Sequence, residues 1–368
     1  MPRVYPLLAK PLLAVQGSEQ AHARALRGLR LMDANGIGRW LLRRNRPRIA
    51  NPVNLLGLTF RNPLGLAAGM DKQGAALRAW DTLGFGFIEV GGITEHAQHG
   101  NPRPRMFRDG EQHALINRMG FNNVGSQAME AHLSARVGTP RWPTVPVFLN
   151  VGKSKTTPNE RAAEDYEATI RRCGPYVDAI VVNVSSPNTA GLRDLQEVTA
   201  LERILHRALE AKQPGQPLLI KVAPDIDEDA LIDLVRLARD LGVAGMVATN
   251  TTLKRSPGSS ARSMRIQSES GGLSGKPLAR RSTEVIRCVA RFTRGGWPII
   301  GVGGISTAED AWEKIINGAS IVQLYSGLVF RGPGIIREVV EGIHERCEAA
   351  GFPSLLDAVG SALQLDTD

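Results

Sequence analysis

Eight short apolar segments alternate with helix-like segments along this chain, and this alternation limits the possible fold more than any other feature. The apolar segments lie at residues 64–69, 85–92, 146–152, 179–186, 217–224, 245–252, 298–304 and 320–327. Strands buried on both faces read as continuous apolar runs, and strands joined through helices pair in parallel. Eight such units fit a closed barrel better than an open, doubly wound sheet. We therefore predict an α/β fold, a (β/α)8 TIM barrel with a small N-terminal helical extension.

Polar residues recur at the carboxyl ends of these predicted strands, where barrel enzymes carry their chemistry. They include Asp71, Lys72, Asn150, Asn183, Ser186, Lys221, Thr249, Asn250, Tyr325 and Ser326. One asparagine at such a place could simply cap the following helix, but a polar end on six strands indicates a ligand site. The last two strands end in GVGGI (301–305) and YSG (325–327). Loops at these two positions commonly bind phosphate, so the sequence favours a phosphorylated ligand.

The middle of the predicted site is rich in amides, from Asn117, Asn183, Asn188 and Asn250. An amide offers both an acceptor and donors, which suits a flat ligand whose edge alternates C=O and N–H, such as a pyrimidine or a flavin. Lys72 and Lys221 would supply positive charge, one to a substrate carboxylate and the other to a reduced flavin. The alternative for both lysines is a structural ion pair, with Asp71 as the nearest candidate partner.

Ser186 is the candidate reactive side chain. All seven histidines lie outside the predicted strand ends, so the sequence does not indicate a Ser-His-Asp arrangement. A serine without a histidine partner is an unusual nucleophile. It suits a base that removes a proton from carbon while a flavin accepts hydride.

Positive charge is concentrated in the first 50 residues. They carry ten arginine and lysine residues against two acidic ones, a net +8 out of +9 for all 368 residues. Leu26 and Leu29 lie at helical spacing, three arginines fall on another face, and Trp40 follows. The residues alone favour a helical cap packed on the barrel over the alternative, an amphipathic helix in an anionic membrane interface.

Three widely spaced cysteines, Cys173, Cys288 and Cys347, predict a reducing compartment and no structural disulfide or zinc site. No segment approaches the apolar length of about 18 residues that a membrane-spanning helix needs.

The chain resembles the class 2 dihydroorotate dehydrogenases, the membrane-associated, quinone-dependent enzymes of pyrimidine biosynthesis, from about residue 5 to residue 360. The motifs that carry the resemblance are NPLGLAAGMDK, LINRMGFNN, NVSSPNTAGLR, KVAPD, ATNTT, GGLSGKPL, PIIGVGGI and VQLYSG. The resemblance implies an FMN-binding (β/α)8 barrel. It would oxidise dihydroorotate to orotate by passing hydride to flavin N5 while a base removes a proton from the neighbouring carbon. Class 2 members have serine as this base, and Ser186 stands at that place.

The resemblance also implies roles for individual residues. The substrate-binding residues would be Lys72, Asn117, Arg118, Met119, Gly120, Phe121, Asn183, Asn188, Asn250 and Thr251. The FMN-binding residues would be Ala68, Gly69, Met70, Asp71, Lys72, Asn150, Asn183, Lys221, Thr249, Gly275, Gly304, Tyr325 and Ser326. The resemblance implies no metal site.

For the whole chain, the resemblance implies a helical membrane-associating and quinone-access segment at 1–48, an FMN-binding barrel at 49–360 and a tail at 361–368. It therefore reverses the preference for a simple cap. We expect a monomer attached peripherally to the cytoplasmic face of the cell membrane. Its partners would be dihydroorotate, orotate and a membrane quinone, and not nucleic acid.

Two positions depart from the family pattern. Gly92 stands where members usually have a hydroxyl residue that contacts FMN, so only a backbone contact could persist there. The loop at 94–105 reads TEHAQHGNPRPR in place of TPxPQPGNPxPR, which affects the expected shape of that loop rather than the reaction.

Two other functions fit parts of the sequence. A tRNA dihydrouridine synthase is also an FMN barrel, but RNA binding favours basic residues around the active-site mouth. Here nearly all the excess charge lies in the first 50 residues. A non-catalytic barrel that only binds membranes would purify colourless, whereas an FMN enzyme would be yellow.

Overall fold

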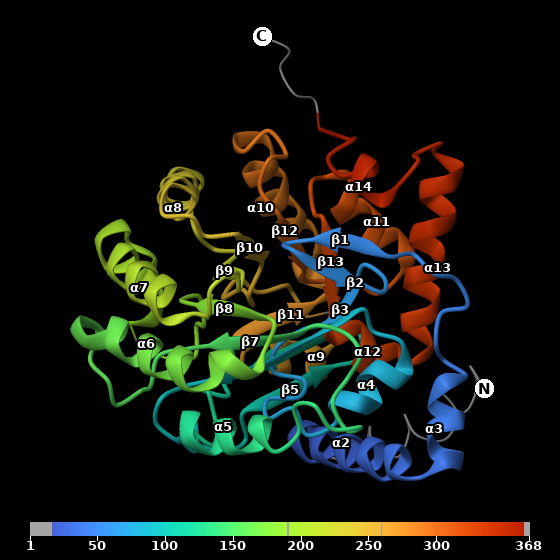
Figure 1. The fold of residues 1–368 in the computed structure, drawn as a ribbon, viewed down its shortest axis with the longest axis horizontal. Helices are drawn as coiled ribbons and strands as arrows, with labels where there is room; N and C mark the ends of the chain where they lie inside the picture. The colour runs from blue at the N-terminus through green and yellow to red at the C-terminus, as the bar shows by residue number, and fades with distance from the viewer. Residues whose placement is uncertain (1–16, 190, 259, 364–368) are drawn as a thin grey trace.

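A closed barrel of eight parallel strands forms the centre of the protein (Figure 1). The computed structural model describes residues 17–189, 191–258 and 260–363. Around the barrel the strands are β3 (Leu64–Leu66), β4 (Phe87–Ile93), β7 (Val147–Val151), β8 (Ala179–Asn183), β9 (Leu218–Val222), β10 (Gly245–Ala248), β12 (Ile299–Val302) and β13 (Ile321–Leu324). All eight predicted strands are confirmed, and the pairing of β13 with β3 closes the barrel.

Residues 1–16 of the predicted membrane-associating segment and residues 364–368 of the predicted tail lie outside the described residues. The domain boundaries after residues 48 and 360 stay predictions.

Helices surround the barrel as Figure 1 shows. Those that follow barrel strands are α4 (Leu77–Leu83), α5 (Ser126–Ser134), α6 (Ala162–Cys173), α7 (Val198–Ala211), α8 (Glu228–Asp240), α10 (Ala279–Phe292), α11 (Ala308–Ile316), α12 (Ser326–Arg331) and α13 (Gly334–Ala349). The described chain also contains α9 (Ala261–Gln267) and α14 (Leu355–Ala358). In α8 the Asp227 side chain caps the first turn by accepting from the Ala230 N–H at 3.0 Å. The buried side chains of α8 recur at helical spacing, which holds one face of the helix on the barrel.

An antiparallel hairpin, β1 (Val53–Leu55) and β2 (Leu58–Phe60), precedes the barrel. Phe60 is fully buried and packs edge-on against Phe87 of β4, with ring centroids 5.3 Å apart, and against Phe148 of β7 at 6.1 Å. An added Cβ on Gly65 would meet the Phe87 ring at 2.2 Å, so the glycine makes room for this ring between β3 and β4. Aromatic side chains therefore fill the barrel near the amino ends of its strands.

A polar layer follows these rings on the same inner face of the strands. Side chains alternate along a strand, so Glu89 shares its face with Phe87, and Asn150 shares its face with Phe148. The register pairs Asn183 with Lys221 across β8 and β9. These polar side chains lie towards the carboxyl ends of the strands, where the polar residues of the sequence were predicted to gather.

A second sheet of three antiparallel strands, β5 (Met106–Asp109), β6 (Ala114–Asn117) and β11 (Gly272–Gly275), is built from the insertions after β4 and β10. Asn117 pairs with Met106 on one side and with Gly272 on the other. The sheet therefore fixes the start of the loop at 117–122.

The first described residues, 17–43, form two helices, α2 (Ser18–Ala34) and α3 (Gly36–Arg43), at one edge of the barrel beside α4 (Figure 1). Three ion pairs hold α2 in place: Glu19 binds Arg105 at 2.7 Å and Arg103 at 3.1 Å, and Asp33 binds Arg78 at 2.8 Å. Ala21 and Leu42 are buried against the rest of the protein. Among the described helices, none has the length and apolar character needed to cross a bilayer.

Lys314 is a fully buried cation of α11 whose three hydrogen-bond acceptors all belong to α10. Its Nζ donates to Ser282 Oγ at 2.6 Å, to Thr283 Oγ1 at 3.1 Å and to the Ala279 carbonyl at 3.3 Å. Burial lowers the pKa of Lys314 from 10.5 to about 7. Since the pKa is lower in the folded state, the unfolded chain binds more protons between about pH 7 and pH 10.5.

We therefore expect Lys314 to favour folding more strongly as pH rises through this window, by up to about 1.4 kcal/mol per pH unit. The free energy of unfolding of the wild type, minus that of Lys314→Met, should increase from pH 7 to pH 10 in denaturant titrations. The matched control is Lys276→Met, since Lys276 is exposed, and its difference should stay flat. A pH-independent difference for Lys314→Met would contradict the prediction.

Candidate active site

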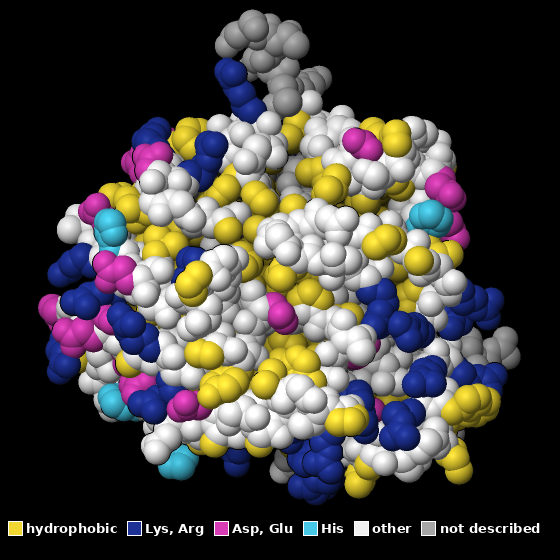
Figure 2. All heavy atoms as spheres, in the orientation of Figure 1, with side chains coloured by type: hydrophobic (Ala, Val, Ile, Leu, Met, Phe, Trp, Pro, Cys, Tyr) yellow, Lys and Arg dark blue, Asp and Glu magenta, His cyan; other side chains and the backbone are white. Residues whose placement is uncertain are grey.

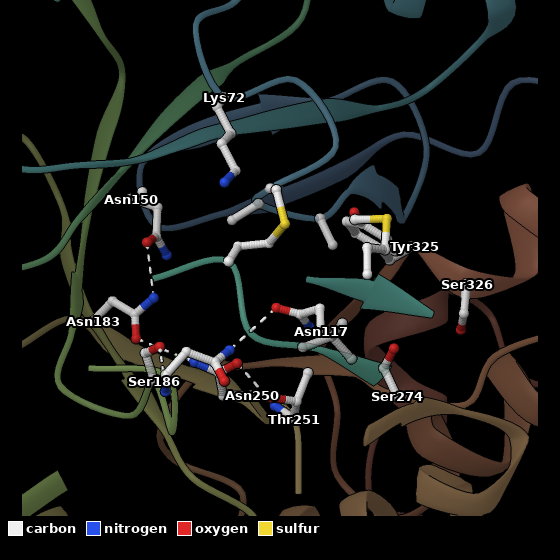
Figure 3. Close-up of a pocket in the computed structure, with 18 of the residues that line it drawn as sticks. Lys72, Asn117, Asn150, Asn183, Ser186, Asn250, Thr251, Ser274, Tyr325 and Ser326 are labelled. Atoms are coloured by element: carbon white, nitrogen blue, oxygen red, sulfur yellow. Dashed lines mark hydrogen bonds between the residues drawn. The ribbon is translucent and has the colours of Figure 1, made fainter. Parts of the chain in front are cut away.

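A cavity of about 470 Å³ opens at the carboxyl ends of the barrel strands (Figure 3). All the predicted site residues line it except Met70 and Arg118. They come from the loop after β3 (Ala68, Gly69, Asp71, Lys72), the loop after β6 (Asn117, Met119, Gly120, Phe121), the ends of β7, β8 and β9 (Asn150, Asn183, Lys221), the loop after β8 (Ser186, Asn188), the residues after β10 (Thr249, Asn250, Thr251), the end of β11 (Gly275) and the loops after β12 and β13 (Gly304, Tyr325, Ser326).

The two exceptions point elsewhere. Arg118 stands between two cavity residues in the sequence, but its side chain turns away from the cavity. It forms an ion pair with Glu269 at 2.8 Å, and its guanidinium stacks over Phe107. Met70 is buried against the N-terminal helices and lines a second cavity described below.

The asparagines form two hydrogen-bonded groups. Asn183 Nδ2 donates to Asn150 Oδ1 at 2.9 Å, a bond drawn in Figure 3, and Asn250 Nδ2 donates to Asn183 Oδ1 at 3.3 Å. Asn188 Nδ2 donates to Asn117 Oδ1 at 3.1 Å and joins the loop after β8 to the loop after β6. The amides are therefore held in fixed orientations around the cavity.

Ser186 lies in the same wall, with 8% of its surface exposed. Its Oγ accepts the Asn188 N–H at 3.3 Å. The neighbouring Ser185 hydroxyl is fully buried and donates to Asn183 Oδ1 at 2.9 Å. The two adjacent serines therefore differ: the Ser186 side chain lines the cavity, whereas the Ser185 hydroxyl is hydrogen-bonded to Asn183.

Lys72 is partly buried and donates to the side-chain and backbone oxygens of Asn122. Burial, with the nearby charge of Arg105, lowers the pKa of Lys72 from 10.5 to about 8. Asp71 does not supply its counter-charge, because that carboxylate accepts the Ala75 and Ala76 N–H groups at 2.7 Å in the turn that precedes α4. Lys72 and Asp71 therefore do not form the ion pair that the sequence left open as an alternative.

Lys221 differs, because its Nζ lies 3.4 Å from Glu89 Oε1. Lys221 therefore forms the structural ion pair that the sequence left open as an alternative, but its partner is Glu89 rather than Asp71. Lys221 also lines the cavity, so the two descriptions apply together.

The lining of the cavity includes groups that could bind a phosphorylated heterocycle. Three buried atoms of residues that line it, Asn188 Oδ1, Thr251 Oγ1 and Gln323 Oε1, have no hydrogen-bond partner among the described residues. Such atoms need a ligand or water to satisfy them. Gly303 and Gly304, which also line the cavity, have φ of 125° and 79°, and a Cβ on Gly304 would come within 2.5 Å of Ala279. Glycines with positive φ let backbone N–H groups close on an anion.

Gly92 also lines the cavity, and the Phe121 ring fills the space beside it. A Cβ added to Gly92 would lie 2.4 Å from Phe121 Cε1 and 3.0 Å from Asn150 Oδ1. A hydroxyl side chain at position 92 would therefore require Phe121 to move.

A second cavity of about 450 Å³ lies between α2, α3 and the barrel. Its lining is mainly apolar and includes Ala25, Gly28, Leu29, Leu42 and Met70. Three residues line both cavities: His22 of α2, Met106 of β5 and Tyr325 after β13. Burial lowers the pKa of His22, and the charge of Lys72 lowers it further.

Several cavity residues were not predicted from the sequence. His22 and Glu19 belong to α2, and only the docking of that helix brings them to the barrel mouth. Gln323 lies in the apolar run of β13, and Asn122 follows the predicted loop. Gln323 had one signal, a single polar residue inside an otherwise apolar strand.

Comparisons with known proteins point to one family. The dihydroorotate dehydrogenase family model matches residues 51–347. The chain is 48% identical over 358 residues to a dihydroorotate dehydrogenase (quinone) from Gloeobacter violaceus, covering 96% of this chain and 98% of that protein. It is 50% identical over 317 residues to a protein of the same name from Halobacterium salinarum, covering 86% and 87%. The crystal structure of a DHODH from Eimeria tenella in complex with ferulenol matches with a TM-score of 0.82 and 34% identity, covering 94% of this chain and 95% of that one.

Proposed function

Because the chain belongs to the dihydroorotate dehydrogenase family, we propose that it oxidises dihydroorotate to orotate, with FMN as cofactor and a membrane quinone as electron acceptor. One observation carries the proposal. A polar cavity with Ser186 and Lys72 adjoins an apolar cavity beneath the N-terminal helices. The family assignment also removes the RNA-modifying FMN barrel from consideration.

FMN, when bound, accepts the hydride that leaves the substrate. The residues proposed to hold its ring are Asn150, Lys221 and Thr249, and those proposed near its phosphate are Gly275, Gly304, Tyr325 and Ser326. The unpartnered oxygens in the cavity and the glycines beside Ala279 support this assignment.

Ser186 is the proposed base that takes the proton from the carbon next to the one that loses hydride. The Asn188 N–H, 3.3 Å from Ser186 Oγ, would favour negative charge on this oxygen. The bonded pair Asn117 and Asn188 would hold the amide edge of the pyrimidine, and Lys72 would pair with the substrate carboxylate.

The second cavity is the proposed quinone site. Its apolar lining suits the ring and tail of a lipid-soluble acceptor. The two cavities share three lining residues, His22, Met106 and Tyr325. An acceptor in the second cavity would therefore be separated from the ligand in the polar cavity by the thickness of a single side chain.

Helices α2 and α3 are the proposed membrane-attachment surface. Figure 2 shows Lys and Arg side chains gathered over the edge that α2 and α3 occupy in Figure 1, with hydrophobic side chains among them. Leu31, Ile37 and Trp40 are 65%, 77% and 56% exposed, and the Arg44 guanidinium lies over the Trp40 ring. Basic, aromatic and aliphatic side chains together favour an anionic lipid surface. Peripheral attachment on the cytoplasmic side would follow, and we expect a monomer.

Anaerobic flavin spectroscopy tests the proposal. Dihydroorotate added to the purified yellow protein should bleach the flavin band, and a short-chain quinone should restore it, whereas fumarate and NAD should not. Recovery with fumarate or NAD would contradict the quinone assignment. A bound flavin that stays oxidised would contradict the substrate assignment, and a colourless protein would favour the non-catalytic barrel.

The lowered pKa of Lys72, about 8, predicts a pH-dependent substrate affinity. Protonated Lys72 attracts the substrate carboxylate, and the proton is lost as pH rises through this value. We therefore expect the Kd for dihydroorotate or orotate, measured by flavin absorbance changes, to rise between pH 7 and pH 9. In Lys72→Met the Kd should be higher at pH 7 and nearly flat over this range. A wild-type Kd that does not change with pH would contradict the assignment of Lys72.

A further inference from the structure

A carboxylate lies inside the barrel beneath the first cavity without lining it. Glu89 of β4 has 0% of its surface exposed. Its Oε1 accepts from Asn150 Nδ2 at 2.6 Å and lies 3.4 Å from Lys221 Nζ. Its Oε2 accepts from Gln323 Nε2 at 2.5 Å. Three strands, β7, β9 and β13, therefore each supply one partner to this anion. Burying a charge is costly unless it is paired and hydrogen-bonded, and here both conditions are met.

The carboxylate sets the direction of a chain of amides. An ionised carboxylate can only accept hydrogen bonds, so Asn150 must turn its NH2 group towards Glu89. Its carbonyl oxygen then faces Asn183 and accepts from Asn183 Nδ2 at 2.9 Å (Figure 3). As a result Asn183 turns its own oxygen towards the Ser185 hydroxyl at 2.9 Å and Asn250 Nδ2 at 3.3 Å.

The same logic applies to Gln323 on the other side. Because its NH2 group donates to Glu89, its Oε1 is left buried, with no partner among the described residues. Gln323 is 1% exposed and lines the cavity. Glu89 thereby leaves Gln323 with a free acceptor at the wall where a ligand would lie.

Lys221 links Glu89 to the charge of the site. Lys221 is 5% exposed and lines the cavity, and Glu89 is its ion-pair partner within the described chain. A nearby cation stabilises a reduced, anionic flavin, whereas a carboxylate paired with that cation offsets part of its effect.

We propose that Glu89 is a positioning residue for the flavin site, since its carboxylate fixes the direction of the Asn150–Asn183 amide chain and offsets the charge of Lys221. This inference rests on the proposed function, because it takes the first cavity to hold FMN. Glu89 acts through Asn150, Gln323 and Lys221 and is not itself a catalytic residue.

The test is the reduction potential of the bound flavin, measured by spectroelectrochemistry without substrate. Glu89→Gln leaves Lys221 with its full charge, so the potential should become more positive. A tenfold greater preference for reduced flavin corresponds to about 30 mV for a two-electron couple. Lys221→Met should shift the potential in the opposite direction. The double variant Glu89→Gln/Lys221→Met removes both charges, and its potential should return towards the wild-type value.

A merely structural role for Glu89 does not predict shifts of opposite sign that cancel. If Glu89→Gln is too unstable to purify with flavin, the comparison of Lys221→Met with the double variant decides, since the double variant contains no unpaired charge from this pair. Equal potentials in those two proteins, or an unchanged potential in Glu89→Gln, would overturn the inference.

Asp109→Asn provides the matched control. Asp109 is also a buried carboxylate, 1% exposed, but it is bonded to Ser263 at 2.6 Å and Gln267 at 3.0 Å outside the barrel. Its replacement should leave the potential unchanged, and a shift as large as that of Glu89→Gln would overturn the inference. A wild-type protein that dihydroorotate bleaches, but whose Glu89 variants lack the predicted shifts, would overturn this inference alone. A wild type that holds no flavin would overturn the proposed function together with it.

Discussion

Replacing Ser186 with alanine should slow the oxidation of dihydroorotate by about 10²–10⁴-fold while FMN remains bound. The substitution removes the proposed base and little else, since Ser186 Oγ accepts one hydrogen bond within the described chain, from the Asn188 N–H. Anaerobic stopped-flow mixing with dihydroorotate should show slow bleaching of the flavin band, and the absorption spectrum before mixing should match that of the wild type.

Ser185→Ala is the matched control for this prediction. It removes a hydroxyl from the adjacent residue, but one that bonds to Asn183 and Asn250 and does not line the cavity. We expect a smaller loss of rate, because the amide positions change while the proton acceptor remains. Near-normal bleaching in Ser186→Ala would rule out its role as the base.

Replacing Gly28 with phenylalanine should block quinone use without slowing flavin reduction. Gly28 lies in α2 and lines the second cavity, and an added Cβ there meets no atom within 4 Å. A phenyl group would occupy space proposed for the quinone and remove about 1.5–3 kcal/mol of apolar burial from that ligand. The KM for a long-chain quinone should therefore rise about tenfold to 100-fold.

Gly36→Phe is the control for this variant. Gly36 is exposed at the start of α3, also has open space around it, and does not line the second cavity. It should leave both half-reactions unchanged. If Gly28→Phe instead slows bleaching by dihydroorotate and leaves reoxidation by quinone intact, the proposed quinone site is wrong.

The barrel and most of the site could be predicted from the sequence for one physical reason. Strands buried on both faces must be apolar along their whole length, so a polar residue at the end of such a run stands out. Asn183 and Lys221 are visible in this way, and the register places them side by side. Because all strands of the closed barrel are parallel, their carboxyl ends meet at the same end of the barrel.

The internal connections of the site could not be predicted. Glu89 and Gln323 are 234 residues apart, yet they share a hydrogen bond because only β3 separates β4 from β13 in the closed barrel. Neither residue lies at a strand end, so each looks like an isolated polar residue in an apolar run. The sequence also does not predict the direction in which a loop side chain points. Met70, for example, turns towards the N-terminal helices.

The described N-terminal helices pack as a cap and also carry features that the membrane alternative requires, and membrane attachment itself stays a prediction. Its helices pack on the barrel through Ala21, Leu42 and the Asp33–Arg78 ion pair, as a cap would. The same helices expose Ile37 and Trp40 beside arginines, as an interfacial helix would. Amphipathic spacing could predict a helix, but not the ion pairs that bring His22 to the cavity, because their partners lie far away in the sequence.

The two cavities are built by different parts of the fold, and substitutions can therefore affect one cavity without the other. The polar cavity is built mainly from strand ends and their loops, whereas residues 18–45 supply much of the wall of the apolar one. If the apolar cavity admits the quinone, as we propose, substitutions in that short stretch would alter which acceptor enters and leave the chemistry at the strand ends as it was. The choice of oxidant would then be separable from the reaction itself.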